Sequence, residues 1–326
     1  MKRIAFLLCA ASALVAIITA PALAQVAAPR LNPNAFEADN AINPATVPWS
    51  GPSRIGLGIL DGSEERTVNG VTTPDSEQKS KYVVQGRYVG ENFAVSAETA
   101  KVEYTSSNNP TQSAEFDVAV VNGAFVIGEM FSIGIGLQNL TGEFKDSTAP
   151  ADSNKAEFTL PQVGLALNFD GFSLGASTGT ETIKKTSVSP PAADVQEEVD
   201  RKVTRAGVGY AMRDSDKGLH IEAFKETKEY ADFTNLNDDN EEDSTGVVLE
   251  VVFANILLGV EAVSTEKNDK TGKLSSEKDA KLFSIGWVPE QGLSVTVTVE
   301  QDETTNPFNS TVSNEDSTFV GVAWLF

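Results

Sequence analysis

The sequence has very few of the residues that carry most protein chemistry. Its 326 residues include one cysteine, Cys9, and one histidine, His220. A single cysteine excludes an internal disulfide and a cysteine-based metal site. Catalysis by a nucleophile usually needs a histidine beside it, and no nucleophile motif, phosphate loop or dinucleotide pattern accompanies His220. We therefore expect a protein that is not an enzyme and that has no catalytic residue, metal site or cofactor.

Positive charge is also scarce. Lysine and arginine number 25 against 46 aspartate and glutamate residues, which gives a net charge of -21. Nucleic acid would repel such a chain, so we expect no nucleic-acid partner. The most acidic run, "NDDNEED" from Asn237 to Asp243, lacks the glycine and the spaced ligands of a calcium loop, which favours a solvated loop over a metal site.

Long apolar runs are absent except at the start of the chain. A basic start at Lys2 and Arg3 precedes an apolar run over residues 4–20 and a small-x-small ending at residues 22–24. This pattern predicts a secretory signal peptide over residues 1–24; an uncleaved N-terminal anchor is the alternative. No other stretch has 18 consecutive apolar residues, so we expect no transmembrane helix.

From Arg54 onward the dominant sequence period is two. In "GLSVTVTVEQ", Leu293, Val295, Val297 and Val299 alternate with polar residues, as in a strand with one apolar and one polar face. Fourteen segments follow this pattern. They lie near residues 53–61, 80–90, 92–105, 111–122, 130–143, 156–169, 172–184, 199–212, 218–230, 245–253, 256–266, 278–288, 292–303 and 315–326.

Two kinds of connection alternate between these segments. Short turns are expected at Gly90-Glu91, near Gly128, at Asp170-Gly171, at Asp214 to Lys217, at Ala254-Asn255 and at Pro289 to Gly292. Longer polar connections, such as "DGSEERTVNGVTTPDSEQKS", lie between them, and this asymmetry is typical of outer-membrane barrels. We therefore predict an all-β fold, a transmembrane antiparallel up-and-down β-barrel of about 14 strands over residues 53–326, with both termini periplasmic. A soluble β-sandwich is the alternative.

The chain ends on "FVGVAWLF", in which Val320, Val322, Trp324 and Phe326 share one face. This ending resembles the C-terminal strand of bacterial outer-membrane barrels, which the barrel-assembly machinery reads as an assembly signal. The resemblance implies export through the periplasm into the outer membrane of a Gram-negative bacterium. Outer-membrane lipids, lipopolysaccharide and the barrel-assembly machinery are then expected partners.

If the apolar register faces lipid, the opposite register lines the lumen, because a Lys or Arg facing lipid would cost about 2–4 kcal/mol at mid-membrane. The predicted lumen-facing residues are Arg87, Glu98, Asp117, Gln138, Arg205, Arg213, His220, Glu222, Glu250, Glu261 and Glu300. Apolar residues share this register, so the lumen has mixed polarity, which suits an amphipathic passenger or a plug. The alternative is that these residues only fill a structural interior.

Residues 25–52 precede the first strand and contain five prolines, which oppose regular structure. Asn43, Pro44 and Ala45 resemble the Asn-Pro-Ala motif in the N-terminal hatch of the long-chain fatty acid and aromatic-hydrocarbon outer-membrane transporter family. That resemblance implies a fourteen-stranded barrel, closed by a hatch, that passes hydrophobic molecules through a lateral opening. We therefore expect residues 25–52 to form a hatch; a disordered periplasmic tail is the alternative.

These expectations favour an outer-membrane channel or transporter for small molecules, including hydrophobic ones, as cargo. Two alternatives stay open. One is a non-specific diffusion porin, in which an acidic lumen would favour cations. The other is a structural or surface-interaction barrel without transport, whose long loops are the active part.

Overall fold

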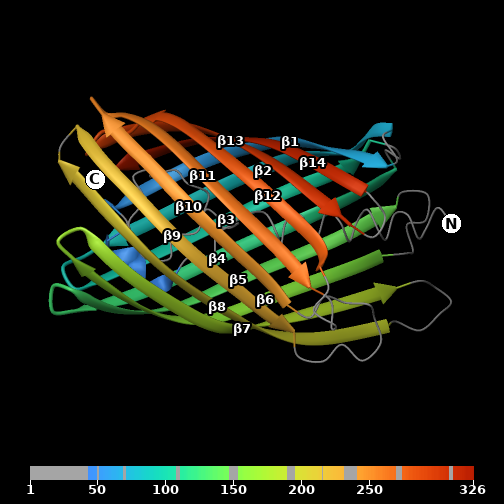
Figure 1. The fold of residues 1–326 in the computed structure, drawn as a ribbon, viewed down its shortest axis with the longest axis horizontal. Helices are drawn as coiled ribbons and strands as arrows, with labels where there is room; N and C mark the ends of the chain where they lie inside the picture. The colour runs from blue at the N-terminus through green and yellow to red at the C-terminus, as the bar shows by residue number, and fades with distance from the viewer. Residues whose placement is uncertain are drawn as a thin grey trace.

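The computed structural model describes residues 43–49, 51–68, 71–107, 111–146, 153–188, 195–214, 216–230, 241–268, 274–307 and 311–326. These residues form one closed antiparallel β-barrel of fourteen strands with a short 3-10 helix, η1 (Pro44–Trp49), inside it (Figure 1). The strands are β1 (Arg54–Val68), β2 (Val71–Val89), β3 (Phe93–Ser106), β4 (Gln112–Ile127), β5 (Phe131–Asp146), β6 (Ser153–Phe169), β7 (Phe172–Val188), β8 (Val195–Asp214), β9 (Lys217–Tyr230), β10 (Glu241–Phe253), β11 (Ile256–Asn268), β12 (Leu274–Trp287), β13 (Gly292–Asn306) and β14 (Thr311–Leu325).

The last strand closes the barrel on the first. In this pairing Arg54 lies opposite Leu325, and Leu60 lies opposite Phe319. Each strand therefore has two hydrogen-bonded neighbours, and the sheet has no open edge. A membrane barrel needs this closure because hydrocarbon offers no partner to a free backbone group. The predicted strand number and antiparallel closure are confirmed, whereas the predicted signal peptide (residues 1–24) lies outside the described residues.

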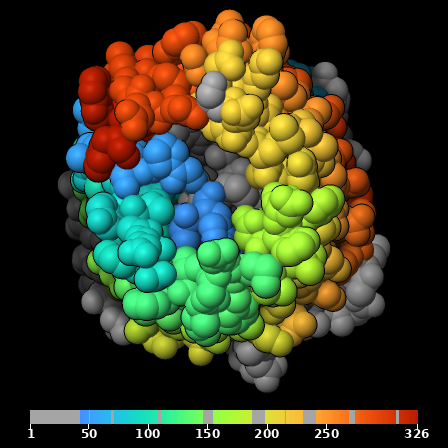
Figure 2. Space-filling model, turned by 90° about the vertical axis from the view of Figure 1, so that its left-hand side faces the viewer, coloured from blue at the N-terminus to red at the C-terminus, as the bar shows by residue number. Residues whose placement is uncertain are grey.

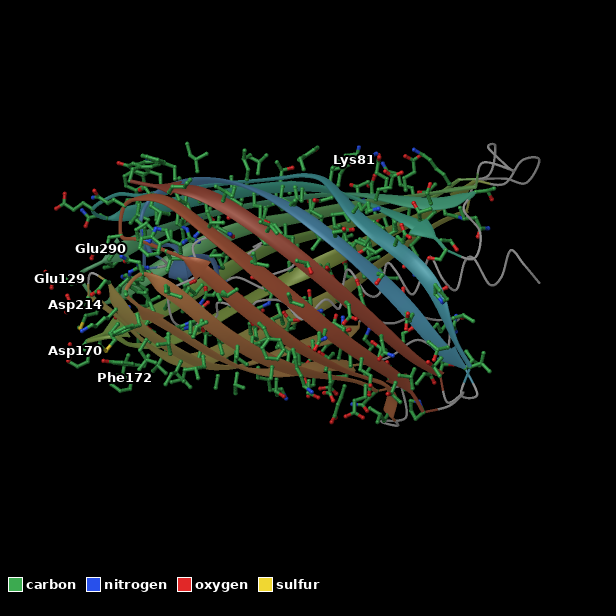
Figure 3. All side chains as sticks on the ribbon, turned by 90° about the horizontal axis from the view of Figure 1, so that it is seen from above. Lys81, Glu129, Asp170, Phe172, Asp214 and Glu290 are labelled. Atoms are coloured by element: carbon green, nitrogen blue, oxygen red, sulfur yellow. The ribbon has the colours of Figure 1, made fainter. Side chains whose placement is uncertain are left out.

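The short turns gather at one end of the barrel, where Figure 3 labels Glu129, Asp170, Asp214 and Glu290. Each joins two consecutive strands at a position that the sequence predicts. The Asp170-Gly171 turn shows the local reason, since both residues have positive φ, 51° and 85°. Two-residue hairpins favour this conformation because it matches the twist of the flanking strands.

At the opposite end the strands run further than the sequence predicts. Residues 61–80 were expected to form a long loop, but β1 and β2 continue as a paired hairpin up to Val68 opposite Val71. Polar residues can continue the hydrogen-bonded pairing of two strands in water, once the membrane-embedded residues have set the register. The change from apolar to polar residues therefore marks the end of the apolar belt, not the end of the strand. The strands accordingly span 13 to 20 residues.

An apolar belt surrounds the barrel next to the short-turn end. On β10, for example, Val247, Leu249, Val251 and Phe253 all face outward and are exposed. Charged side chains begin in the outward register where the belt ends. There, hydrogen bonds from Lys101 and then Lys81 lower the pKa of Glu115 to about 2 (Lys81 is labelled in Figure 3). Such a belt, bounded by charge, is the lipid-facing surface of an outer-membrane type of barrel.

No helix among the described residues is long and apolar enough to cross a membrane.

Candidate functional site: the lumen and its hatch

The helix η1 lies inside the barrel and covers one side of the lumen. It packs against β3 to β7, and its residues from Pro44 to Val47, together with Asn43, are fully buried. Figure 2 looks onto the short-turn end and shows the blue N-terminal residues within the central hollow, beside the strands coloured cyan and green. The Asn-Pro-Ala motif therefore lies within the lumen, against the wall.

Asn43 organises this segment through both its side chain and its backbone. Its Nδ2 donates a hydrogen bond to the carbonyl oxygen of Leu165 on β6 (2.9 Å), and its Oδ1 accepts one from the backbone N–H of Ala45 (3.0 Å). Its carbonyl accepts from both the backbone N–H (3.0 Å) and the hydroxyl (2.8 Å) of Thr46. The Ser132 hydroxyl on β5 donates to the carbonyl of Ala45. Asparagine suits this position because its amide can close a local turn and also donate to the wall.

Two glycines make room for the motif in the barrel wall. A Cβ on Gly164 would overlap Asn43 Oδ1 and would lie 3.1 Å from Pro44 Cδ. A Cβ on Gly134 would overlap the backbone of Pro44 and Ala45. The two glycines are direct cross-strand partners on β5 and β6. Only glycine permits such a close approach of two backbones, so Gly134 and Gly164 form the place where Asn43, Pro44 and Ala45 rest, here called the seat.

An uncharged wall rises from this seat towards the long-loop end. The lumen-facing register of β4, of β5 from Ser132 to Phe144 and of β6 contains no charged residue among those described. Three rings, Tyr104, Phe116 and Phe144, meet edge to face with centroids 5.3 and 5.7 Å apart. They belong to one apolar cluster, here called the apolar track, made of Leu60, Val83, Ala100, Val102, Tyr104, Ala114, Phe116, Val118, Val120, Leu140, Phe144, Ala156, Phe158, Ile183 and Phe319.

The adjoining part of the wall, on β8 to β11, carries a buried network of ion pairs. Arg205 pairs with Glu226 and donates to Gln162 (2.7 Å) on β6. Lys228 bridges Glu226 (3.1 Å) and Glu242 (2.7 Å). The network continues from Glu242 to Lys267 (3.3 Å). A buried charge is stable only when an oppositely charged group pairs with it. The charges of this network therefore stabilise one another.

Replacing Lys228 with alanine should therefore strongly destabilise the barrel. Two carboxylates would lose their shared partner while still buried, and breaking such a pair costs about 3–5 kcal/mol. Lys225 on the same strand pairs with Asp243 (2.8 Å) but faces outward, with 55% of its side chain exposed. Lys225→Ala should cost less than about 1 kcal/mol. Denaturant unfolding of both variants in lipid vesicles measures the difference, and equal losses would contradict the role of the buried network.

His220 forms a second polar cluster nearer the short-turn end. Its Nδ1 lies 3.0 Å from a carboxylate oxygen of Glu250, and its Nε2 lies 3.3 Å from one of Glu222. All three side chains are buried, and the imidazole links β9 to β10. No group of three or more His, Cys, Asp or Glu side chains in the described part of the chain could hold a metal ion.

All but one of the predicted lumen-facing residues lie in the inward register. These are Arg87, Glu98, Gln138, Arg205, Arg213, His220, Glu222, Glu250, Glu261 and Glu300. The prediction for Asp117 is wrong, because Asp117 faces outward and lies 3.5 Å from Lys101. Its neighbours Phe116 and Val118 point inward into the apolar track. The rule that apolar side chains face lipid fails on this part of β4, since the strand there has left the apolar belt.

The C-terminal residues that resemble an assembly signal share the outward face of β14. Val322, Trp324 and Phe326 are exposed, Val320 is half-exposed, and the intervening Ala323 and Leu325 are buried. Phe326 donates its backbone N–H to the carbonyl of Ser53 (3.1 Å) and so continues the closing ladder.

Sequence reasoning missed the seat and the apolar track. Gly134 and Gly164 stand in the lumen register of alternating segments, so their position was readable. Their contacts with Asn43, Pro44 and Ala45 were not readable, because they join residues that lie far apart in the chain. The track had a signal in "AEFDVAVV" (residues 114–121), where apolar residues alternate with charged and small ones. The two-residue alternation was recognised there, but the wrong one of its two faces was assigned to the lumen.

Solved structures share this fold at low sequence identity. The structure titled CymD monoaromatic hydrocarbon channel matches with a TM-score of 0.52 and 11% identity, over 87% of this chain and 91% of that chain. The Pseudomonas putida toluene transporter TodX matches at 0.51 and 10%, over 87% and 92%. A Pseudomonas aeruginosa FadL homologue matches at 0.50 and 8%, over 87% and 93%. No family model and no curated protein sequence matches the chain. The resemblance predicted from the sequence is confirmed as a resemblance of fold.

Proposed function

We propose that this protein is an outer-membrane channel that passes small hydrophobic molecules and is closed by an N-terminal hatch. One observation carries the proposal: an uncharged, aromatic-rich track lines one wall of a barrel and leads to a buried plug segment. A pathway for apolar solutes needs such a wall, since a carrier site is mostly apolar with few placed polar groups. A hatch seated by hydrogen bonds to the wall gives the channel a closed state.

The titles of the similar solved structures name hydrophobic cargo. Their titles describe a monoaromatic hydrocarbon channel and a toluene transporter. Their low identity to this chain extends only to the fold, so the cargo proposed here rests on the track itself. Within this proposal, residues 1–24 are a signal peptide, residues 25–52 form the hatch segment, and residues 53–326 form the barrel in the outer membrane of a Gram-negative bacterium.

The remaining assignments follow from the same placement. The outward face of Val320, Val322, Trp324 and Phe326 would be read by the barrel-assembly machinery, and lipids and lipopolysaccharide would surround the belt. Arg87, Glu98, Gln138, Arg205 and the other inward polar residues would line or brace the lumen. Asn43, Pro44 and Ala45 would hold the hatch in place.

An open diffusion porin is the less favoured reading. The charged side chains of the network around Glu242 are almost fully buried and paired with one another. A porin's water-filled channel leaves such side chains hydrated. The alternative of a structural barrel without transport does not explain why an uncharged track lies beside a plug segment.

Reconstituted vesicles test the proposal directly. The unaltered protein should speed the entry of benzene or toluene over protein-free vesicles, while it should admit little sugar and show low conductance in planar bilayers. Deleting residues 25–52 should raise conductance and sugar entry, because the hatch segment is gone. If the deletion leaves conductance and hydrocarbon entry unchanged, the gated channel is wrong. Large, steady conductance of the unaltered protein would favour the porin, and no flux of any solute would favour the structural barrel.

A further inference from the structure

The barrel wall is irregular at one point beside the apolar track. The pairing of β1 with β2 slips between Gly58 opposite Val83 and Asp61 opposite Lys79. The pairing of β2 with β3 slips at the same level, where no β3 residue stands opposite Lys81 in the backbone register. Bulges of this kind re-aim side chains and are over-represented at the working parts of barrels.

At this point a side chain replaces a missing backbone hydrogen-bond acceptor between β1 and β2. The backbone N–H of Leu60 donates to the Ser80 hydroxyl (2.6 Å). Leu60 keeps its pairing on the other side, where Phe319 of β14 lies opposite it. The wall therefore stays closed here while its regular geometry is locally lost.

The Phe319 ring presents its Cζ–Cε2 edge to Gly58 at this irregular point. A Cβ on Gly58 would overlap the Cζ and Cε2 atoms of Phe319, and it would lie 3.3 Å from the carbonyl oxygen of Val320. The ring is almost fully buried and belongs to the apolar track together with Leu60 and Val83. A glycine beneath an aromatic ring is a known device of curved sheets, in which the ring covers the exposed backbone.

We propose that Phe319, whose ring fills the space that a side chain at position 58 would need, is a specificity-determining residue that sets how wide a solute the apolar track can pass. This inference rests on the proposed channel function. With glycine at position 58, the ring keeps its buried place in the wall. With any Cβ below it, the ring must rotate towards the barrel axis, because close-packed interiors do not absorb such an overlap. The ring would then narrow the pathway for wide solutes before narrow ones.

The barrel contains a matched control on its charged wall. The Phe224 ring lies over Gly246 in the same way, with a Cβ on Gly246 placed 2.5 Å from Cε1 and 3.0 Å from Cε2 of the ring. Phe224 and Gly246 are direct partners on β9 and β10. Phe224 is also buried but lies outside the apolar track. The same substitution therefore imposes the same kind of strain on the opposite side of the lumen.

The experiment measures the uptake of benzene, naphthalene and phenanthrene by vesicles that contain each variant. Gly58→Ala should lower the naphthalene-to-benzene and phenanthrene-to-benzene uptake ratios several-fold. Phe319→Ala should raise both ratios, and Gly58→Ala combined with Phe319→Ala should restore them at least to the unaltered level. Gly246→Ala should leave the ratios unchanged. If Gly58→Ala does not assemble, the uptake ratios of Phe319→Ala alone test the inference.

Each other result overturns the inference in a recognisable way. A uniform drop for all three probes in Gly58→Ala, with no rescue by Phe319→Ala, would show a purely structural role. An equal shift of the ratios in Gly246→Ala would show that the effect does not depend on the track. If the unaltered protein takes up no benzene above empty vesicles, the proposed function itself fails and this inference with it. If the unaltered protein takes up benzene but Gly58→Ala and Phe319→Ala leave the uptake ratios unchanged, this inference is wrong and the proposed function stands.

Discussion

Gly164→Val is expected to unseat the hatch and open the lumen. The first atom of the new side chain would already overlap Asn43 Oδ1, and it would lie 3.0 Å from Asn43 Cγ. Asn43 cannot withdraw without losing its bond to the Leu165 carbonyl and, with it, the position of the turn that holds Ala45. Each such hydrogen bond contributes about 1 kcal/mol net, and a buried group left without its partner costs about 1–3 kcal/mol. Conductance in planar bilayers should rise several-fold, and sugar should enter vesicles that the unaltered protein keeps closed.

A neighbouring glycine provides the control. Gly123 on β4 lies opposite Ile135 on β5, the same strand that carries Gly134, and a Cβ there would meet nothing within 4 Å. Gly123→Val should therefore assemble and remain closed. If Gly164→Val assembles and conducts no more than Gly123→Val, the seat does not hold the channel shut. A Gly164→Val barrel that fails to fold is replaced by Gly134→Ala, which adds only one carbon at the same seat.

Val118→Glu is expected to abolish most hydrocarbon uptake while the barrel still assembles. Val118 lies in the middle of the apolar track, on a strand whose described lumen register has no charge. A carboxylate there would keep water around it, because burying an unpaired charge costs several kcal/mol. An apolar solute would have to pass that hydrated group. Since each 1.4 kcal/mol added to a barrier slows passage tenfold, uptake of toluene by vesicles should fall by at least about tenfold.

Val263→Glu is the matched control on the other wall. Val263 is as buried as Val118 and also faces the lumen, but it lies between Gly246 and Ala280 on β10 and β12, outside the apolar track. Its carboxylate should change toluene uptake by less than about twofold, which is far less than the tenfold change that 1.4 kcal/mol of added barrier produces. If both variants lose uptake equally, the solute does not follow the track. If neither loses it, hydrocarbon does not pass through this lumen.

Much of the architecture was readable from local pattern. Alternation such as Leu293, Val295, Val297 and Val299 has a period that only a strand produces. Turn chemistry such as Asp170-Gly171 has one favoured geometry, so strand number and turn positions followed from neighbouring residues alone. The closing pairing of the last strand with Arg54 to Leu60 also followed, because a barrel must join its first strand to its last.

The inward or outward sense of a strand was readable only within the belt. There, solvation by lipid decides which register is apolar, and the inward residues Glu222, Glu250 and Glu261 were placed on that basis. Beyond the belt, water replaces lipid on the outside and either face can be polar or apolar. The sequence therefore placed Asp117 on the wrong side and overlooked Phe116. The polar residues 61–80 were read as a loop for the same reason.

The sequence by itself determined a closed barrel of alternating strands, its short-turn end, and a proline-rich segment whose Asn43, Pro44 and Ala45 resemble a hatch. These features depend on neighbours along the chain and on the choice between lipid and water. Only the tertiary structure decided that Asn43 rests on Gly164, that apolar side chains gather into one track while ion pairs gather on β8 to β11, and that Phe319 lies against Gly58. Those features arise when closure brings distant strands around one lumen, and no local pattern encodes which side chains then meet.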